Sequence, residues 1–277
     1  MLAAVNATLS SIHIYPLKSC APLPLEQALV QTRGLAHDRR WMIVDADGKF
    51  LTGRQQPRLT LIRAVPDGDS VQLTAPGMPP LRIDPPPADG ERVDSAVWGA
   101  PVRPLLAGAT AQAWITTFFG APCRIVYMDA DCVRPLKAKY EGRYGIDSDE
   151  VSFADGFPLL LISQAALDAL NARLAAPVPM LRFRPNLVVA GTPPHAEDGW
   201  KRIRVGTIEF EVAKACVRCV FTTVDFERGA FDPSGEPLRT LIGYRRGSDG
   251  TGVQFGQNLI PRGRGTVRVG DAVEVLA

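Results

Sequence analysis

Short strand-forming runs broken by tight turns recur along most of this chain, and they restrict its fold more than any other feature. Segments 40–52, 59–74, 202–212 and 266–276 each contain two runs of apolar or β-branched residues around a turn with Gly, Asp or Pro. In segment 202–212 both runs alternate apolar and polar residues, so one face of that hairpin is solvated. The sequence therefore predicts a mainly β protein with a few helices and an antiparallel, barrel-like architecture.

Three helices are expected, over residues 110–119, 163–174 and 237–245. The first can begin with Thr110 as its N-cap and end at a glycine. The second has the strongest pattern, because Ser163 can cap it and leucines recur on one face. The third has a proline in its first turn, where proline is tolerated.

The chain has 277 residues, enough for one large domain or two modest ones. Residues 76–90 are rich in Pro, Gly and Asp and are typical of an irregular loop. Residues 129–156 mix charge, Gly and Tyr without periodicity, which indicates a linker or a long surface loop. We therefore place a boundary near residue 125 and predict domains over residues 1–125 and 126–277.

Composition and charge exclude several classes of partner. The net charge is only +2, so no broad attraction to nucleic acid or to an anionic membrane is expected. No stretch approaches the roughly 20 apolar residues of a membrane-spanning helix, and the first residues lack the pattern of a signal peptide. The five cysteines are odd in number and irregularly spaced. We expect a cytoplasmic protein with free thiols.

The segment Cys216-Val217-Arg218-Cys219 is the first candidate for chemistry. A thioredoxin-like pair needs a helix at the motif, whereas residues 220–224 look like a strand. Structural zinc needs two more ligands at matching spacing, and the other Cys and His residues are scattered. A single thiolate on a soft metal, activated by the neighbouring arginine, is the third reading. Two buried small residues without chemistry remain an equal alternative from spacing alone.

Other segments carry groups suited to an anion. Lys18 and Ser19 follow a strand that ends at a proline, and Arg39 precedes the first hairpin. In an extended segment, Arg182, Arg184 and Asn186 would share one side. Solvated lysine and arginine side chains are the alternative in each case. Residues 255–258 (Phe-Gly-Gln-Asn) are expected to form a turn that lets the backbone approach a ligand.

The order of these motifs resembles that of the MOSC family. Six segments carry the resemblance, and they extend over almost the whole chain. The first three resemble the N-terminal β-barrel module of the family and the last three resemble the MOSC domain itself. They are residues 14–20 (IYPLKSC), 38–41 (DRRW), 52–59 (TGRQQPRL), 183–187 (FRPNL), 216–225 (CVRCVFTTVD) and 255–258 (FGQN).

The resemblance implies a molybdenum cofactor of the molybdopterin type, with a cysteine of the protein on the metal. In the family the second cysteine of the run is that ligand, which corresponds to Cys219. Animal members tend to have Ser and Tyr at the positions of Val217 and Asn258, so backbone contacts are the ones that carry over there. The positions that match cofactor-contacting residues are Lys18, Ser19, Arg39, Arg184, Asn186, Val217, Arg218 and Asn258.

The resemblance further implies a detoxifying reductase of small N-oxygenated compounds, namely hydroxylamines, amidoximes or hydroxylaminopurine-like bases. No cysteine follows Cys219, so the C-x4-C-x2-C pattern of a ferredoxin domain is missing. Electrons are therefore expected from a separate ferredoxin-, flavodoxin- or cytochrome b5-like protein with its reductase. A non-enzymatic cofactor carrier or sulfur-handling protein is the alternative. Pyridoxal phosphate belongs to the sulfurase partner domain of some fusions, and it is not expected in this chain.

Overall fold

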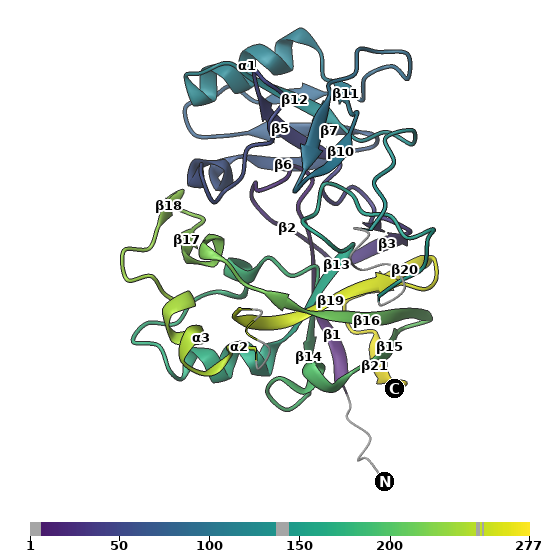
Figure 1. Cartoon of the computed structure of the whole chain (residues 1–277), viewed down its shortest axis with the longest axis vertical. Helices are drawn as coiled ribbons and strands as arrows, with labels where there is room; N and C mark the ends of the chain where they lie inside the picture. The colour runs from purple at the N-terminus through teal and green to yellow at the C-terminus, as the bar shows by residue number, and fades with distance from the viewer. Residues whose placement is uncertain (1–6, 137–143, 248–249, 251) are drawn as a thin grey trace.

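The structure is a computed structural model that describes residues 7–136, 144–247, 250 and 252–277. Two bodies lie one above the other in Figure 1. The upper body contains residues from about 41 to 127, and the lower body contains the first strand together with most of the chain after residue 159. The chain thus starts in the lower body, builds the upper one and returns. The predicted boundary near residue 125 stays a prediction.

A closed barrel of seven strands forms the lower body. The strand order is β14-β13-β19-β16-β15-β21-β1, and pairing of β1 with β14 closes the ring. Only β13 and β14 run parallel among the pairs of this sheet, and β2 (Leu23–Leu25) extends it beyond β1. The barrel strands are β1 (Ala7–Ile14), β13 (Leu159–Ser163), β14 (Leu187–Ala190), β15 (Arg202–Val205), β16 (Ile208–Val217), β19 (Gln254–Pro261) and β21 (Ala272–Val275).

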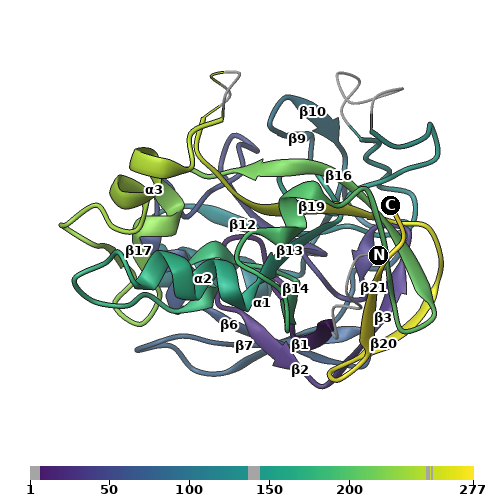
Figure 2. The ribbon, with the colours of Figure 1, turned by 90° about the horizontal axis from the view of Figure 1, so that it is seen from below.

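Alternating side chains fill the barrel interior. Leu9, Ile12, Phe210 and Leu259 are fully buried there, while polar neighbours along the same strands reach solvent. A small sheet of β20 (Gly265–Arg268), β3 (Gln27–Gln31) and β4 (Gly34–Leu35) lies at one end of the barrel, and the helices α2 (Gln164–Asn171) and α3 (Leu238–Tyr244) lie at the other (Figure 2).

The upper body has its own core beneath helix α1 (Ala109–Phe119). Trp41, Ile43, Trp114 and Ile115 are buried in it. Its strands are β5 (Trp41–Asp45), β6 (Arg63–Asp67), β7 (Ser70–Thr74), β8 (Leu81–Ile83), β9 (Ser95–Val97), β10 (Ala100–Val102), β11 (Leu105–Leu106) and β12 (Cys123–Tyr127). The expected fold, mainly β with a few helices and a barrel, is confirmed.

The three expected helices are present, with changes at their ends. Helix α1 begins after Gly108 rather than at Thr110, and it ends at the left-handed Gly120 as expected. In α2 the hydroxyl oxygen of Ser163 accepts a hydrogen bond from the backbone N–H of Ala166, which confirms the predicted cap. Helices α2 and α3 are shorter than predicted by a few residues.

Some expected strands and pairings are wrong. The hairpin of segment 59–74 exists, but β6 is its first arm, and residues before it form the 3-10 helix η1 (Pro57–Leu61). Strands β20 and β21 do not pair with each other, because β20 pairs with β3 and β21 pairs with β1 and β15. The run after Cys219, expected as a strand, is a 3-10 turn, η5 (Val220–Thr223), followed by β17 (Val224–Asp225), which pairs with β18 (Ala230–Phe231).

Candidate functional site

One pocket lies where the barrel meets the upper body. The loop after β1, segments of the upper body, residues 154–160 and the end of β16 all line it. The structure brings every residue of the predicted site to this pocket: Lys18, Ser19, Arg39, Arg184, Asn186, Val217, Arg218, Cys219 and Asn258. Their roles toward a cofactor stay predictions.

The two thiols of the motif have different surroundings. Cys216 is the last residue but one of strand β16, and its sulfur accepts a hydrogen bond from Nη1 of Arg218 at 2.9 Å. Cys219 is the extended N-cap residue of η5, and its carbonyl accepts from the hydroxyl of Thr222 at 2.9 Å. The arginine expected beside a reactive thiol therefore contacts Cys216. Among the described residues no group of three or more His, Cys, Asp or Glu side chains is placed to hold a metal ion.

The segment that carries Arg184 and Asn186 is not extended. A short 3-10 helix, η3 (Met180–Phe183), precedes Arg184, whose backbone is left-handed at φ 58°. This bend, rather than strand alternation, turns Arg182, Arg184 and Asn186 into the pocket. Nη1 of Arg184 donates to the carbonyl of Cys20 at 2.7 Å, while its Nη2 is buried with no protein partner. Burial lowers the pKa of Arg184 to about 10, so the group stays cationic at neutral pH.

Tyr15 is the platform for two of the arginines. Its ring is fully buried, with the guanidinium of Arg184 at 4.0 Å and that of Arg39 at 4.2 Å from the ring centre. Arg39 also pairs with buried Asp38 and donates to Oδ1 of Asn186 at 3.0 Å. Asn186 therefore orients Arg39. The sequence motif contained Tyr15, but nothing in it indicated this role.

Lys18 is buried, so the alternative of a solvated lysine is wrong. Its Nζ donates to the carbonyl of Phe153 at 2.7 Å and to Oδ1 of Asp155 at 2.6 Å. Burial lowers the pKa of Lys18 to about 8, against the opposing effect of Asp155. Burial acts to raise the pKa of Asp155, but the charge of Lys18 outweighs it and holds that pKa below its usual range. Arg54 approaches the other carboxylate oxygen of Asp155 at 3.0 Å.

Residues 255–258 are part of strand β19 rather than a turn. Gly256 has φ 78° at a bulge where β19 runs against β16, and a side chain there would meet the backbone of Leu161 at 2.7 Å. Asn258 donates from Nδ2 to the carbonyl of Lys214 at 3.1 Å. Val217 is 43% exposed, and its backbone contact with a cofactor stays a prediction.

The donor set of the pocket fits an anionic, sulfur-ligated group. Six cations line it, and Asp155 is the one acidic residue among the described lining residues. The unpartnered Nη2 of Arg184 is a donor that an anionic ligand would satisfy. Two thiols add soft donors of the kind that molybdenum accepts. The six cations are Lys18, Arg39, Arg54, Arg182, Arg184 and Arg218.

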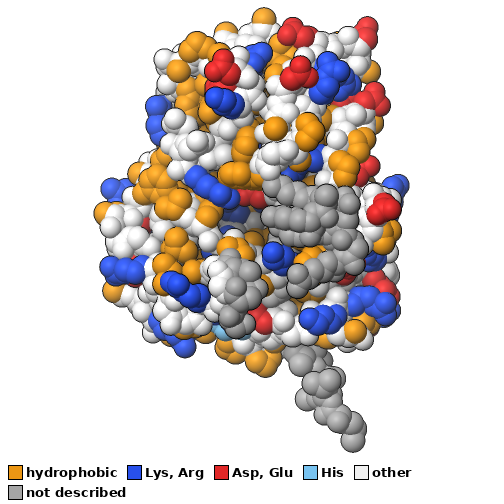
Figure 3. Space-filling model, in the orientation of Figure 1, with side chains coloured by type: hydrophobic (Ala, Val, Ile, Leu, Met, Phe, Trp, Pro, Cys, Tyr) orange, Lys and Arg blue, Asp and Glu red, His pale blue; other side chains and the backbone are white. Residues whose placement is uncertain are grey.

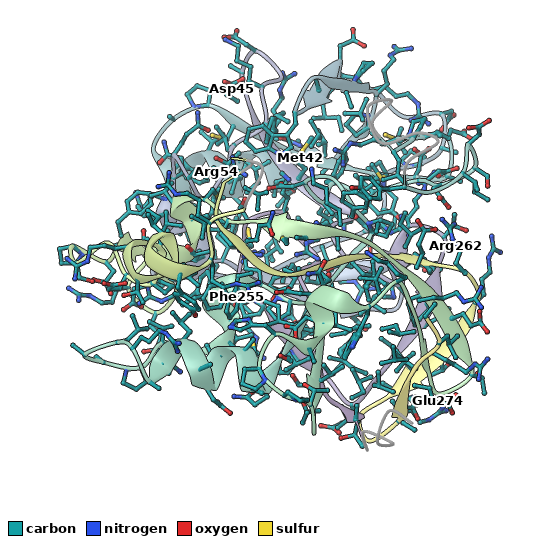
Figure 4. The ribbon with its side chains drawn as sticks, turned by 60° about the horizontal axis from the view of Figure 1, so that its bottom comes forward. Met42, Asp45, Arg54, Phe255, Arg262 and Glu274 are labelled. Carbon is teal, nitrogen blue, oxygen red and sulfur yellow. The ribbon has the colours of Figure 1, made fainter. Side chains whose placement is uncertain are left out.

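Figure 4 shows Arg54 in the upper half of its view, above Phe255 of β19, whereas Arg262 and Glu274 lie to one side. Sequence reasoning missed Asp155, Arg54 and Trp98, all of which line the pocket. Arg54 lies within one of the segments that carried the resemblance, so that motif could have indicated it. Asp155 and Trp98 lie outside every motif.

Comparison with known proteins decides the family. The model of the MOSC N-terminal beta barrel domain matches residues 6–122, and that of the MOSC domain matches residues 148–274. Mitochondrial amidoxime-reducing component 1 of Xenopus laevis is 35% identical over 95% of this chain and 80% of its own length. The chain belongs to the MOSC family. The human protein of the same name is 34% identical over 97% of this chain and 83% of its own length.

The MOSC match is spread over the whole pocket. Lys18, Ser19 and Arg39 fall in the N-terminal barrel match, and the remaining predicted residues fall in the MOSC domain match. Among solved structures, the YUAD protein from Bacillus subtilis aligns over 97% of this chain and 94% of its own, with a TM-score of 0.46 and 12% identity. In the described residues of this MOSC protein, every helix is too short or too polar to cross a membrane.

Proposed function

We propose that this chain is a molybdenum-cofactor-dependent reductase of small N-oxygenated compounds. The observation that carries the proposal is the pocket itself, in which Cys219 lies beside a set of buried cations with an unpartnered donor on Arg184. The relatives named as amidoxime-reducing components support the choice of substrate, since each matches nearly the whole chain.

Each residue of the pocket then has a task. Cys219 would provide the protein thiolate to the metal, and Lys18, Ser19, Arg39 and Arg184 would hold the pterin and neutralise its phosphate. Asn186 keeps Arg39 oriented, and Arg218, Val217 and Asn258 would complete the contacts. When bound, a molybdenum centre supplies two-electron chemistry that can remove oxygen from an N–O bond. The protein binds and orients the partners of that reaction.

The electrons would come from a separate ferredoxin-, flavodoxin- or cytochrome b5-like protein with its reductase. We place the protein in the cytoplasm, a reducing compartment in which thiols stay free. All five cysteines are free in the structure. On the face shown in Figure 3, basic and acidic side chains are both spread over the surface rather than gathered by sign.

The decisive experiment is expression in a host that makes the cofactor. We expect about one molybdenum and one pterin per chain, and reduction of benzamidoxime with an artificial electron donor. NADH or NADPH with the purified chain alone should give no turnover. Loaded protein that reduces none of several N-oxygenated substrates would reject the reductase and favour the cofactor carrier. Protein that takes up no molybdenum would reject both.

A further inference from the structure

A second hollow in the upper body adjoins the pocket that contains the thiols. Thr52, Arg54 and Trp98 line both, so they form a shared wall. Beyond that wall the second hollow is bounded by Phe50 and by strand β9. A molecule that reached the thiols from this side would pass over Trp98.

The wall is aromatic and held in place. The ring of Trp98 packs edge-on against Phe50 with centroids 5.0 Å apart, and the guanidinium of Arg54 lies 4.3 Å from the indole. Trp98 and Gly99 form the two-residue turn between β9 and β10, with φ values of 53° and 84°. A bulky residue rarely adopts positive φ, and such strain gathers where function requires a fixed side chain.

Asp155 stands next to this wall. Its carboxylate receives Nζ of Lys18 at 2.6 Å on one oxygen and Nη2 of Arg54 at 3.0 Å on the other. The side chain is nevertheless 58% exposed. A carboxylate accepts about four hydrogen bonds and donates none, so Asp155, which lines the pocket, can still accept a hydrogen bond from a ligand.

We propose that Trp98 and Asp155 determine which substrates this enzyme selects, with Trp98 contacting a flat aromatic body and Asp155 accepting a hydrogen bond from an N–H beside the N–O group. This inference rests on the proposed function and deepens it. Aryl amidoximes and aryl hydroxylamines have both features. A tertiary amine N-oxide has no N–H, and an alkyl amidoxime has no ring.

Binding to the molybdenum-loaded protein without an electron donor tests the inference, because no turnover occurs. The ligands are benzamidoxime, acetamidoxime and N,N-dimethylaniline N-oxide, measured by calorimetry or by competition. We expect Asp155→Asn to weaken both amidoximes about tenfold and to leave the N-oxide nearly unchanged. Trp98→Leu should weaken the two aromatic ligands about fivefold and spare acetamidoxime. Trp98→Phe, which keeps a flat ring, should retain most of their affinity.

Asp131→Asn is the matched control, because that carboxylate is 80% exposed and lies outside both hollows. Molybdenum content, measured for every variant, shows whether the pocket is still loaded. Equal losses for all three ligands, or no loss, would overturn the inference. Selective binding by a wild-type protein that reduces none of the ligands would instead reject the proposed function and leave this selectivity standing.

Discussion

At the scale of single residues, Cys216 and Cys219 are three positions apart but are not equivalent. Cys216 already receives a hydrogen bond from Arg218, whereas the Cys219 thiol lies in the same pocket at the start of η5. We predict that Cys219→Ser lowers bound molybdenum by roughly tenfold or more, because a hydroxyl is a poor ligand for a soft site. Cys216→Ser should retain the metal. Elemental analysis of both variants, with thermal melts as a check of folding, measures this.

Lys18 gives the protein a dependence of stability on pH. Burial lowers its pKa from 10.5 in the unfolded chain to about 8. Between these values the unfolded chain binds more protons than the folded one, so the free energy of unfolding rises with pH across this window. Below pH 8 the folded protein bears the full cost of burying the charged Lys18 ammonium. The difference between the two pKa values corresponds to roughly 3 kcal/mol of unfolding free energy.

We therefore predict that wild-type protein gains stability relative to Lys18→Met as the pH rises from 7.5 to 10.5. Urea unfolding of both proteins at several pH values in this range gives the difference. Lys49→Met, which removes an exposed lysine, should show no such trend. A flat difference for Lys18→Met would mean that Asp155 compensates the burial of Lys18 completely.

At the scale of elements, Arg134 fastens the loop that carries Asp155. This arginine is almost fully buried, and it donates to the backbone carbonyls of Ser152, Ala154 and Asp155. Arg134→Met would leave these carbonyls without their donor, at a cost of roughly 2–4 kcal/mol in unfolding free energy. We expect faster hydrogen exchange over residues 152–156 as well. Arg103→Met, at an exposed position, should change neither measurement.

Two of the errors of the sequence prediction lie in 3-10 turns that side-chain hydrogen bonds stabilise. In η5 the hydroxyls of Thr222 and Thr223 donate to the carbonyls three residues earlier, and Thr60 does the same in η1. Such bonds stabilise a 3-10 turn. The same run of β-branched residues predicts a strand when only the sequence pattern is considered. The barrel was predictable because alternating runs dominate it.

The candidate site was predictable only as far as its motifs extend. All nine predicted residues reach the pocket, but Lys18 and Asp155 are 137 positions apart and no local pattern links them. Trp98 is likewise brought in by a hairpin turn whose usual residues are Asn or Asp. Contacts of this kind follow from the packing of the two bodies.

At the scale of the whole molecule, Gly53 and Phe221 connect the upper body to the turn that holds Cys219. A Cβ on Gly53 would lie 2.2 Å from the ring of Phe221, which immediately follows the turn's first residue. The guanidinium of Arg184 lies 5.2 Å from the same ring. A methyl group at position 53 would therefore push against both the interface and the cation set of the pocket.

We predict that Gly53→Ala lowers the free energy of unfolding by roughly 1–3 kcal/mol, the usual cost of overpacking. It should also reduce molybdenum retention, because displacing the Phe221 ring would shift the turn that begins at Cys219. The double variant Gly53→Ala/Phe221→Leu makes room for the methyl group. The double variant should recover both stability and metal content, while Phe221→Leu alone should improve neither. That outcome would show that the close fit of Gly53 against the Phe221 ring holds the two bodies together at the site. Loss of metal that persists in the double variant would show that the ring of Phe221, rather than its fit against Gly53, is what the pocket requires.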